Sequence, residues 1–231
     1  MESYARDFQR TRPDDPMLRL RLARALNALE RGNESLDVYK ELVAQGEADE
    51  QAYLEYARVM RNRADSARAQ AMLDDSVAKY PDHVGLRVAR ARFFGEERKF
   101  EQMKQELDEA ARLAPEEPNV LQAQAEYAVS QHDWRQASAL GERIIQIDPQ
   151  RADAYLLLGS TYARLSESSK GIALLEGLDP AFRVDNPEIF LTLFDLRISQ
   201  GQYDEAAQVI TDYSEAYPSQ KSISDYMNAR V

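Results

Sequence analysis

The sequence predicts an all-α protein made of a repeated helix hairpin, and three observations support this prediction. Only nine Gly and nine Pro occur in 231 residues, while Ala, Leu, Arg, Glu and Gln are abundant, a composition that favours helix. Apolar residues recur at helical spacing, as in the stretch 155–162. Small residues, aromatics and prolines return every 34 residues, as Pro81, Pro115 and Pro149 illustrate.

The 34-residue period can be followed along almost the whole chain. Successive units begin at Pro16, Glu50, Val84, Pro118, Ala152 and Pro187. Only the last step is longer, at 35 residues, and its extra residue falls within 176–187. We therefore expect one solenoid domain over 1–231. Its six full units span 16–49, 50–83, 84–117, 118–151, 152–186 and 187–220.

Each unit is expected to fold as two antiparallel helices. Positions 8 and 20 of the unit hold mostly small residues, such as Ala23 and Ser35 in the first unit and Gly159 and Gly171 in the fifth. Small side chains at two points 12 residues apart allow the two helices to approach closely. A proline at position 32, as at Pro149, ends the second helix because it cannot continue the helical hydrogen bonds.

The two ends of the chain are expected to be incomplete units. Residues 1–15 have the pattern of the second helix of a preceding unit, and residues 221–231 that of the first helix of a following one. The chain therefore has the pattern of a segment from a longer array. Because an unpaired second helix and an unpaired first helix are complementary, copies of the chain could also associate head to tail.

The charge distribution argues against several classes of partner. The net charge is −11, with 20 basic against 22 acidic residues in 1–115 and 9 against 18 in 116–231. Nucleic acids and anionic membranes attract clustered positive charge, so neither is expected as a partner, whereas a basic partner suits the second half. No apolar run approaches the roughly 20 residues of a membrane span, so no membrane insertion is expected.

Nothing in the sequence indicates catalysis. Cysteine is absent, which excludes thiolate metal sites, cysteine nucleophiles and disulfides. The two histidines, His83 and His132, lie 49 residues apart, and no metal-binding or phosphate-binding motif occurs. Acid pairs such as Asp74–Asp75 are typical of a solvated face. We therefore expect no enzyme activity, no cofactor and no metal.

The fifth and sixth units carry the clearest resemblance to a known family. The pattern Tyr155-x₂-Leu158-Gly159-x₂-Tyr162 and the segment 201–210, GQYDEAAQVI, resemble the tetratricopeptide repeat. The resemblance covers nearly all of the chain, although Phe194, Met103 and Ser76 depart from the family pattern. It implies a right-handed superhelix whose concave groove, lined by first helices, binds a segment of a partner protein. We expect a non-enzymatic scaffold within a bacterial multiprotein assembly.

The resemblance also implies a map of the groove. In the family, groove-facing side chains come from positions 2, 5, 9, 12 and 13 of the first helix. Position 9 holds arginine in the first three units and polar or acidic residues later, which predicts a groove that is basic toward the N-terminus and acidic toward the C-terminus. The candidate residues are Arg24, Asn27, Arg58, Arg61, Asn62, Arg92, Gln122, Glu126, Asp153, Leu156, Ser160, Glu188 and Asp195.

Two features of this map limit the kinds of partner that we expect the groove to bind. Arg24, Arg58 and Arg92 can bind carboxylates bidentately and thus an acidic segment, or they can pair with neighbouring Glu and Asp. Leu20 and Arg24 replace the Lys and Asn of the family's chaperone-binding clamp, so binding of a chaperone tail is not expected. The mostly apolar residues at position 5 form either a groove floor or part of the core between units.

A second, more specific resemblance concerns export systems. Cysteine-free repeats rich in Ala, Arg, Glu and Gln are similar to the periplasmic repeat regions of bacterial envelope proteins that export exopolysaccharide, such as the Pel, alginate and cellulose systems. This resemblance implies a scaffold in biofilm formation that recruits a polysaccharide-modifying enzyme or guides a cationic polysaccharide. It favours the periplasm or cell envelope over the cytoplasm.

Overall fold

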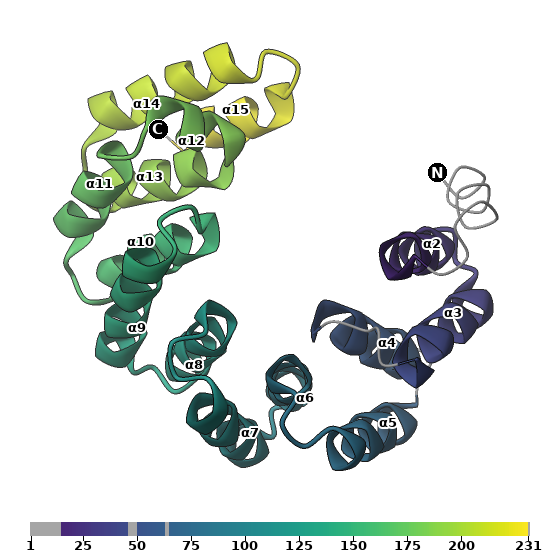
Figure 1. The fold of residues 1–231 in the computed structure, drawn as a ribbon. Helices are drawn as coiled ribbons and strands as arrows, with labels where there is room; N and C mark the ends of the chain where they lie inside the picture. The colour runs from purple at the N-terminus through teal and green to yellow at the C-terminus, as the bar shows by residue number, and fades with distance from the viewer. Residues whose placement is uncertain (1–14, 46–49, 63–64, 231) are drawn as a thin grey trace. The chain divides into compact units, whose positions relative to one another are not determined.

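A computed structural model describes residues 15–45, 50–62 and 65–230 of the chain. These residues form helices and no strand, which confirms the predicted all-α class (Figure 1). The second helix expected within 1–15 lies outside the described residues, apart from Asp15. The helices are α2 (Pro16–Ala28), α3 (Gly32–Ala44), α4 (Glu50–Asn62), α5 (Ser66–Lys79), α6 (Val84–Glu96), α7 (Phe100–Leu113), α8 (Pro118–Ser130), α9 (Trp134–Ile147), α10 (Ala152–Arg164), α11 (Ser168–Glu176), α12 (Pro180–Asp185), α13 (Glu188–Ser199), α14 (Tyr203–Ala216) and α15 (Lys221–Asn228).

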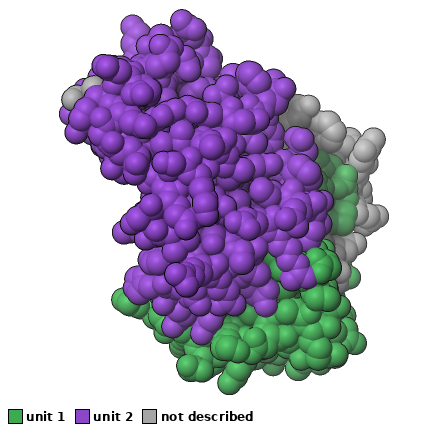
Figure 2. All heavy atoms as spheres, turned by 90° about the vertical axis from the view of Figure 1, so that its left-hand side faces the viewer, with its two compact units in different colours: residues 1–123 green, residues 124–231 purple. Residues whose placement is uncertain are grey.

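The chain divides into two compact units, residues 1–123 and 124–231, which Figure 2 colours separately. In unit 1 the hairpins α2/α3, α4/α5 and α6/α7 pack internally, and α4 also packs against α6. The first helices α2, α4 and α6 lie along one side of unit 1, here called the first-helix side, and the second helices lie along the other (Figure 1). In unit 2, α10 packs against α9, α11 and α13, while α14 packs against α13 and α15.

Side chains placed just before several helices satisfy the first free backbone N–H groups. The carboxylate of Asp15 accepts from the N–H of Met17 at 3.0 Å, and Asp133 accepts from Gln136 at 3.0 Å. His83 has the same role before α6, because its Nδ1 accepts from the N–H of Leu86 at 3.1 Å. Capping of this kind fixes where each helix begins. His83 is therefore a structural histidine.

Five of the hairpin turns have a left-handed residue at position 15 of the unit, and the corresponding residue of the second unit lies outside the described residues. Their φ values lie between 59° and 69°, and the next backbone N–H bonds five residues back, for example from Lys99 to the carbonyl of Phe94 at 2.8 Å. This is the Schellman ending of a helix, in which glycine is the residue of least strain. Only one of the five carries glycine: they are Glu30, Arg98, His132, Ser166 and Gly201.

Close approach of the two helices at positions 8 and 20 is confirmed. In the first hairpin the Ser35 hydroxyl donates to the carbonyl of Ala23 at 2.9 Å. In the fifth, a Cβ added to Gly171 would lie 3.5 Å from the Cα of Gly159. The helices are therefore nearly in backbone contact at these points, which larger side chains would prevent.

The two oversized residues of the pattern are accommodated by their neighbours. A Cβ on Gly95 would lie 2.8 Å from the Sδ of Met103, so the missing side chain of Gly95 leaves the space that Met103 fills. Phe194 is completely buried in the cluster that contains Met227 of α15, and the Arg230 guanidinium lies 5.3 Å from the centre of its ring. The packing around Met103 and Phe194 thus accommodates their larger side chains, and the hairpins keep the same fold.

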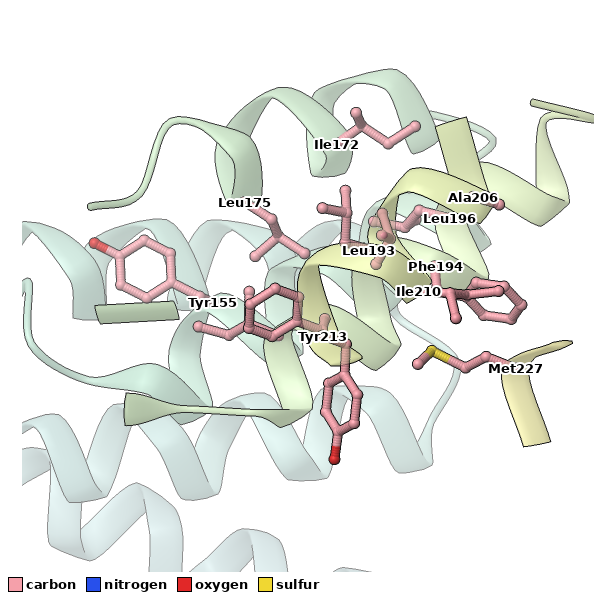
Figure 3. Packing of buried hydrophobic residues seen from close by; sticks show 13 residues of the cluster. Tyr155, Ile172, Leu175, Leu193, Phe194, Leu196, Ala206, Ile210, Tyr213 and Met227 are labelled. Carbon is pink, nitrogen blue, oxygen red and sulfur yellow. The ribbon is translucent and has the colours of Figure 1, made fainter. Parts of the chain in front are cut away.

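The core of unit 2 joins five helices through one hydrophobic cluster (Figure 3). Phe190 packs edge-on against Tyr213, with ring centres 5.8 Å apart. The Tyr213 hydroxyl, at the edge of the cluster, donates to the side chain of Gln220 at 2.7 Å. Burial of this many apolar side chains is the main source of stability in such a unit. The cluster comprises Tyr155, Ile172, Leu175, Ile189, Phe190, Leu193, Phe194, Leu196, Ala206, Val209, Ile210, Tyr213 and Met227.

The longer fifth repeat contains an additional short helix. Its second helix α11 ends early, at Glu176, and α12 follows over Pro180–Asp185. Phe182 of α12 packs edge-on against Tyr155, with ring centres 5.7 Å apart, and its carbonyl accepts from the Asn186 amide at 2.7 Å. The insertion is therefore packed against the core of unit 2.

Glycine at position 15 is expected to stabilise the hairpin turns. Ser166→Gly should raise the free energy of unfolding by about 0.5–1 kcal/mol, because the serine is held at φ 61°. Gly201→Ala is the matched converse, since a Cβ there meets nothing within 4 Å and adds only backbone strain. Thermal unfolding should show shifts of opposite sign, and shifts of the same sign would contradict this account of the turn.

Candidate functional site

Three of the candidate residues meet in a hollow between α2 and α4. Arg24 and Asn27 come from α2 and Arg58 from α4, and the hollow has a volume of about 300 Å³. The side chains of Arg24 and Arg58 are 44% and 42% exposed. The remaining lining residues are Ala28, Tyr39, Glu55 and Val59.

Glu55 is the centre of a hydrogen-bonded network in this hollow. Its carboxylate accepts from Arg24 Nε at 2.9 Å and from the Tyr39 hydroxyl at 2.9 Å, while Gln51 donates at 3.0 Å. Burial by itself raises the pKa of this carboxyl, but the three hydrogen bonds and the charge of Arg24 outweigh it, so the pKa of Glu55 is lowered. Burial, and next the Glu55 charge, raise the pKa of Tyr39 far above its ordinary value.

The second arginine is paired in a similar way. Arg58 and Arg61 both bind the carboxylate of Glu96 at the end of α6, Arg61 at 2.5 Å. Arg24 and Arg58 therefore each bind a carboxylate of the following hairpin, as the alternative interpretation of the arginine column expects. Arg92 lies half-buried on α6, and the side chain of Asn62 lies outside the described residues. That Arg24, Arg58 and Arg92 bind a partner stays a prediction.

Sequence reasoning missed the carboxylates that complete the hollow. Glu55 stands 31 residues after Arg24, and Glu96 stands 38 residues after Arg58. The two separations differ, so no single spacing predicts both pairs. A search for acidic residues on the first helix of the hairpin after each arginine would have found them.

Position 5 belongs mainly to the core of unit 1. Leu20, Leu54 and Val88 are at most 5% exposed, which favours the packing interpretation over a groove floor. Gln122 occupies the same position on α8 and is 7% exposed, and its side-chain carbonyl has no hydrogen-bond partner. Gln122 is therefore a buried polar residue, less accessible than the groove map expects.

The candidate residues of unit 2 remain spread over separate helices. Asp153 pairs with Arg151 at 3.2 Å, and Asp195 pairs with Arg230, which follows α15, at 2.6 Å. Ser160 is exposed and donates to the carbonyl of Leu157 at 2.9 Å. Of the other candidates, Glu188 is exposed, while Leu156 and Glu126 are half-buried. Leu156 packs against the hydrophobic cluster of unit 2.

The described residues offer no assembled chemical centre. No group of three or more His, Asp or Glu side chains among them could hold a metal ion. His132 occupies a hairpin turn, with its ring 5.4 Å from that of Trp134, and His83 caps α6. Every described helix is too short or too polar to cross a membrane.

Comparisons with solved structures show a tetratricopeptide repeat fold. A tetratricopeptide repeat protein from Parabacteroides merdae has a TM-score of 0.61 at 11% identity, over 99% of this chain and 90% of that one. PilF of Pseudomonas aeruginosa has a TM-score of 0.59 at 14% identity, over 99% of both chains. YrrB, described as a TPR protein with an unusual peptide-binding site, has a TM-score of 0.53 at 12% identity, over 79% and 94%. No protein-family model and no curated protein matches the sequence.

Loss of the Glu55 charge should weaken unit 1 in a pH-dependent way. Glu55→Gln should lower the free energy of unfolding by about 1 kcal/mol at pH 7, because charge-assisted bonds to Arg24 are lost. Since the pKa of Glu55 is lowered from its ordinary 4.5, the wild-type advantage is present above that value and disappears as pH falls below it.

Thermal unfolding at pH 7 and pH 3 measures this difference. Glu41→Gln, an exposed residue of α3, is the matched control and should behave as wild type at both pH values. A wild-type advantage over Glu55→Gln that is undiminished at pH 3 would contradict the assignment.

Proposed function

We propose that the chain is a non-enzymatic scaffold that binds a segment of a partner protein on the first-helix side of unit 1. The observation that carries this proposal is the hollow between α2 and α4, where Arg24, Asn27 and Arg58 meet. Stacked hairpins of this fold present an extended row of first helices, which suits binding of a peptide or helix. Partner binding is a typical use of the fold, and YrrB is described as having a peptide-binding site.

The chemistry of the hollow favours an acidic segment. The side chains of Arg24 and Arg58, each more than 40% exposed, line the hollow together with one carboxylate, that of Glu55. Their pairing with Glu55 and Glu96 holds Arg24 and Arg58 in fixed positions, so less side-chain entropy is lost when a partner carboxylate binds. The exposed amide of Asn27 can both donate to and accept from a partner backbone. Ala28 and Val59 supply a small apolar contact.

A negative charge placed at Asn27 should weaken binding of an acidic segment. Selection of a displayed random peptide library on the wild-type chain should enrich peptides with Asp and Glu. Asn27→Asp should then raise the Kd of a selected peptide about tenfold, on the order of 1.4 kcal/mol, because the new carboxylate repels it while the bonds of Glu55 to Arg24, Gln51 and Tyr39 stay intact. Fluorescence anisotropy provides the measurement.

The same substitution on the other side of unit 1 is the control. Asn33→Asp changes an exposed residue of the second helix α3 and should leave the Kd unchanged. Enrichment of no peptide, or equal effects of the two substitutions, would contradict a binding site in the hollow.

The export hypothesis is a more specific form of scaffold and rests on the sequence. It is supported by the absence of cysteine and by the acidic second half of the chain. A partly deacetylated amino-sugar oligomer, such as a chitosan oligosaccharide, is the probe for a cationic polymer. Binding that weakens in Glu188→Gln would favour this hypothesis, and no binding at low ionic strength would count against polymer guidance.

A further inference from the structure

The core of the third hairpin contains charges where the other hairpins have mainly apolar residues. Positions 4, 7 and 23 of this unit are Arg87, Arg90 and Glu106. The first unit has arginine at position 4 and the fourth has glutamine at position 7, but only the third has charges at all three. The equivalent residues are Tyr53, Tyr56 and Met72 in the second unit, Tyr155, Leu158 and Leu174 in the fifth, and Phe190, Leu193 and Val209 in the sixth.

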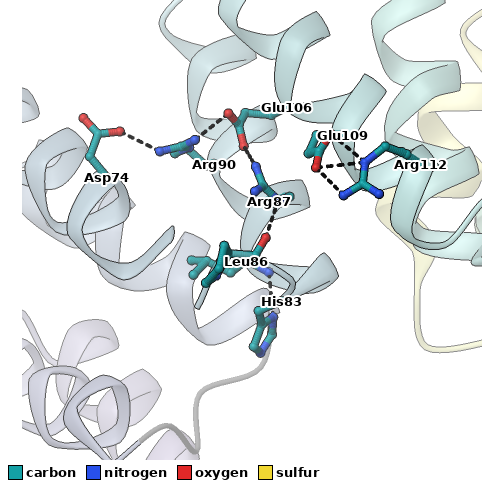
Figure 4. Close-up of polar contacts among 9 residues, drawn as sticks. Asp74, His83, Leu86, Arg87, Arg90, Glu106, Glu109 and Arg112 are labelled. Atoms are coloured by element: carbon teal, nitrogen blue, oxygen red, sulfur yellow. Dashed lines mark hydrogen bonds and ion pairs between the residues drawn. The ribbon is translucent and has the colours of Figure 1, made fainter. Parts of the chain in front are cut away.

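These three side chains form a buried ionic triad that reaches beyond its own hairpin (Figure 4). Glu106 of α7 binds Arg90 through one oxygen and Arg87 through the other, the latter at 3.2 Å. The three side chains are only 11–15% exposed. Arg90 also binds Asp74 of α5 at 3.0 Å, and Arg87 Nε donates to the carbonyl of Pro81 at 2.8 Å. The triad therefore connects α7, α6 and α5.

Stability alone does not explain the triad. Buried charges lose hydration, and replacing a buried ionic triad with well-packed apolar residues is often neutral or stabilising. Compensation is incomplete here, because Arg90 Nε is buried and has no hydrogen-bond partner among the described residues. Aromatic or aliphatic residues fill the same positions in the second, fifth and sixth units, so a core without charges is compatible with this hairpin. The charges must then contribute something that an apolar core does not.

What the charges add is discrimination between similar helices. Arrays of like hairpins have interchangeable apolar faces, which makes mispairing and exchange of hairpins between copies a hazard during folding. Arg90 binds Asp74 at position 25 of the preceding unit, but position 25 is also acidic in the third, fourth and fifth units, so this contact does not distinguish their second helices. Position 23 holds a carboxylate only in the third unit, and pairing α6 with any other second helix would leave Arg87 without a counterion. The residues at position 23 of the other units are Val38, Met72, Leu140, Leu174 and Val209.

We propose that Arg87, Arg90 and Glu106 form a polar lock that selects α7 as the hairpin partner of α6. A wrong pairing leaves at least one buried charge without its counterion. The lock thus disfavours pairing of α6 with another second helix, within one chain or between two chains, and does not maximise the stability of the correct assembly.

Replacement of the lock by leucine separates selection from stability. The triple variant Arg87→Leu, Arg90→Leu, Glu106→Leu should have a Tm equal to wild type or higher by about 2–10 °C. After refolding from denaturant at high protein concentration, it should contain a severalfold larger share of dimers and higher oligomers formed by mispaired helices than wild type. Size-exclusion chromatography with light scattering measures that share as a function of concentration.

Two further variants make the result interpretable. Glu106→Leu alone leaves Arg87 without a carboxylate partner and Arg90 with Asp74 only. Its Tm should fall by at least about 6 °C if the triad forms in solution. Glu109→Gln with Arg112→Gln removes a neighbouring exposed ion pair of α7, which Figure 4 also shows, and should refold as wild type does.

Two kinds of result would overturn the proposal. A triple variant that yields no more dimer than wild type at any concentration would overturn the lock. A triple variant that loses as much Tm as Glu106→Leu, or fails to fold, would show that the triad is needed for stability, and this too would overturn the proposal.

Discussion

The close approach of the two helices at positions 8 and 20 is the constraint on which the rest of this fold depends. Where Gly171 lies against Gly159, and where Ser35 bonds the carbonyl of Ala23, nothing larger would allow the helices to stay antiparallel at this separation. Once a hairpin is closed in this way, its remaining apolar faces can be buried only by stacking on the next hairpin. Where the pattern fails, as at Met103, the missing side chain of Gly95 supplies the space.

Stacking then determines which side chains can act together. First helices of successive hairpins lie along the same side of unit 1, so residues 31 or 38 positions apart become neighbours (Figure 1). Arginines of one hairpin bind carboxylates of the next, both in the hollow around Glu55 and at Glu96. These pairs neutralise part of the charge on that side and fix the guanidiniums in place, so a partner encounters an ordered surface.

Much of this arrangement could be predicted from the sequence, because the repeat is encoded locally. Prolines and small residues indicate where helices begin, end and cross, and register alone brings Arg24 and Asn27 to one side. The left-handed turns could not be predicted in general, since only Gly201 among them is a glycine. The partner of Arg24 depends on the stacking of two hairpins and on side-chain rotamers, so Glu55 was missed. The burial of Gln122 depends likewise on its neighbours, and position alone suggested exposure.

The central claim is that a partner protein contacts the first-helix side of unit 1, and site-specific photo-crosslinking tests it most directly. A photoreactive amino acid is placed at Asn27, or at Asn33 on α3, in the chain expressed in its native cell. The account predicts one discrete crosslinked partner from position 27 that is absent from position 33, and loss of that adduct when Arg58 is changed to Glu. Crosslinks from position 33 alone, or an equal pattern from both positions, would contradict it.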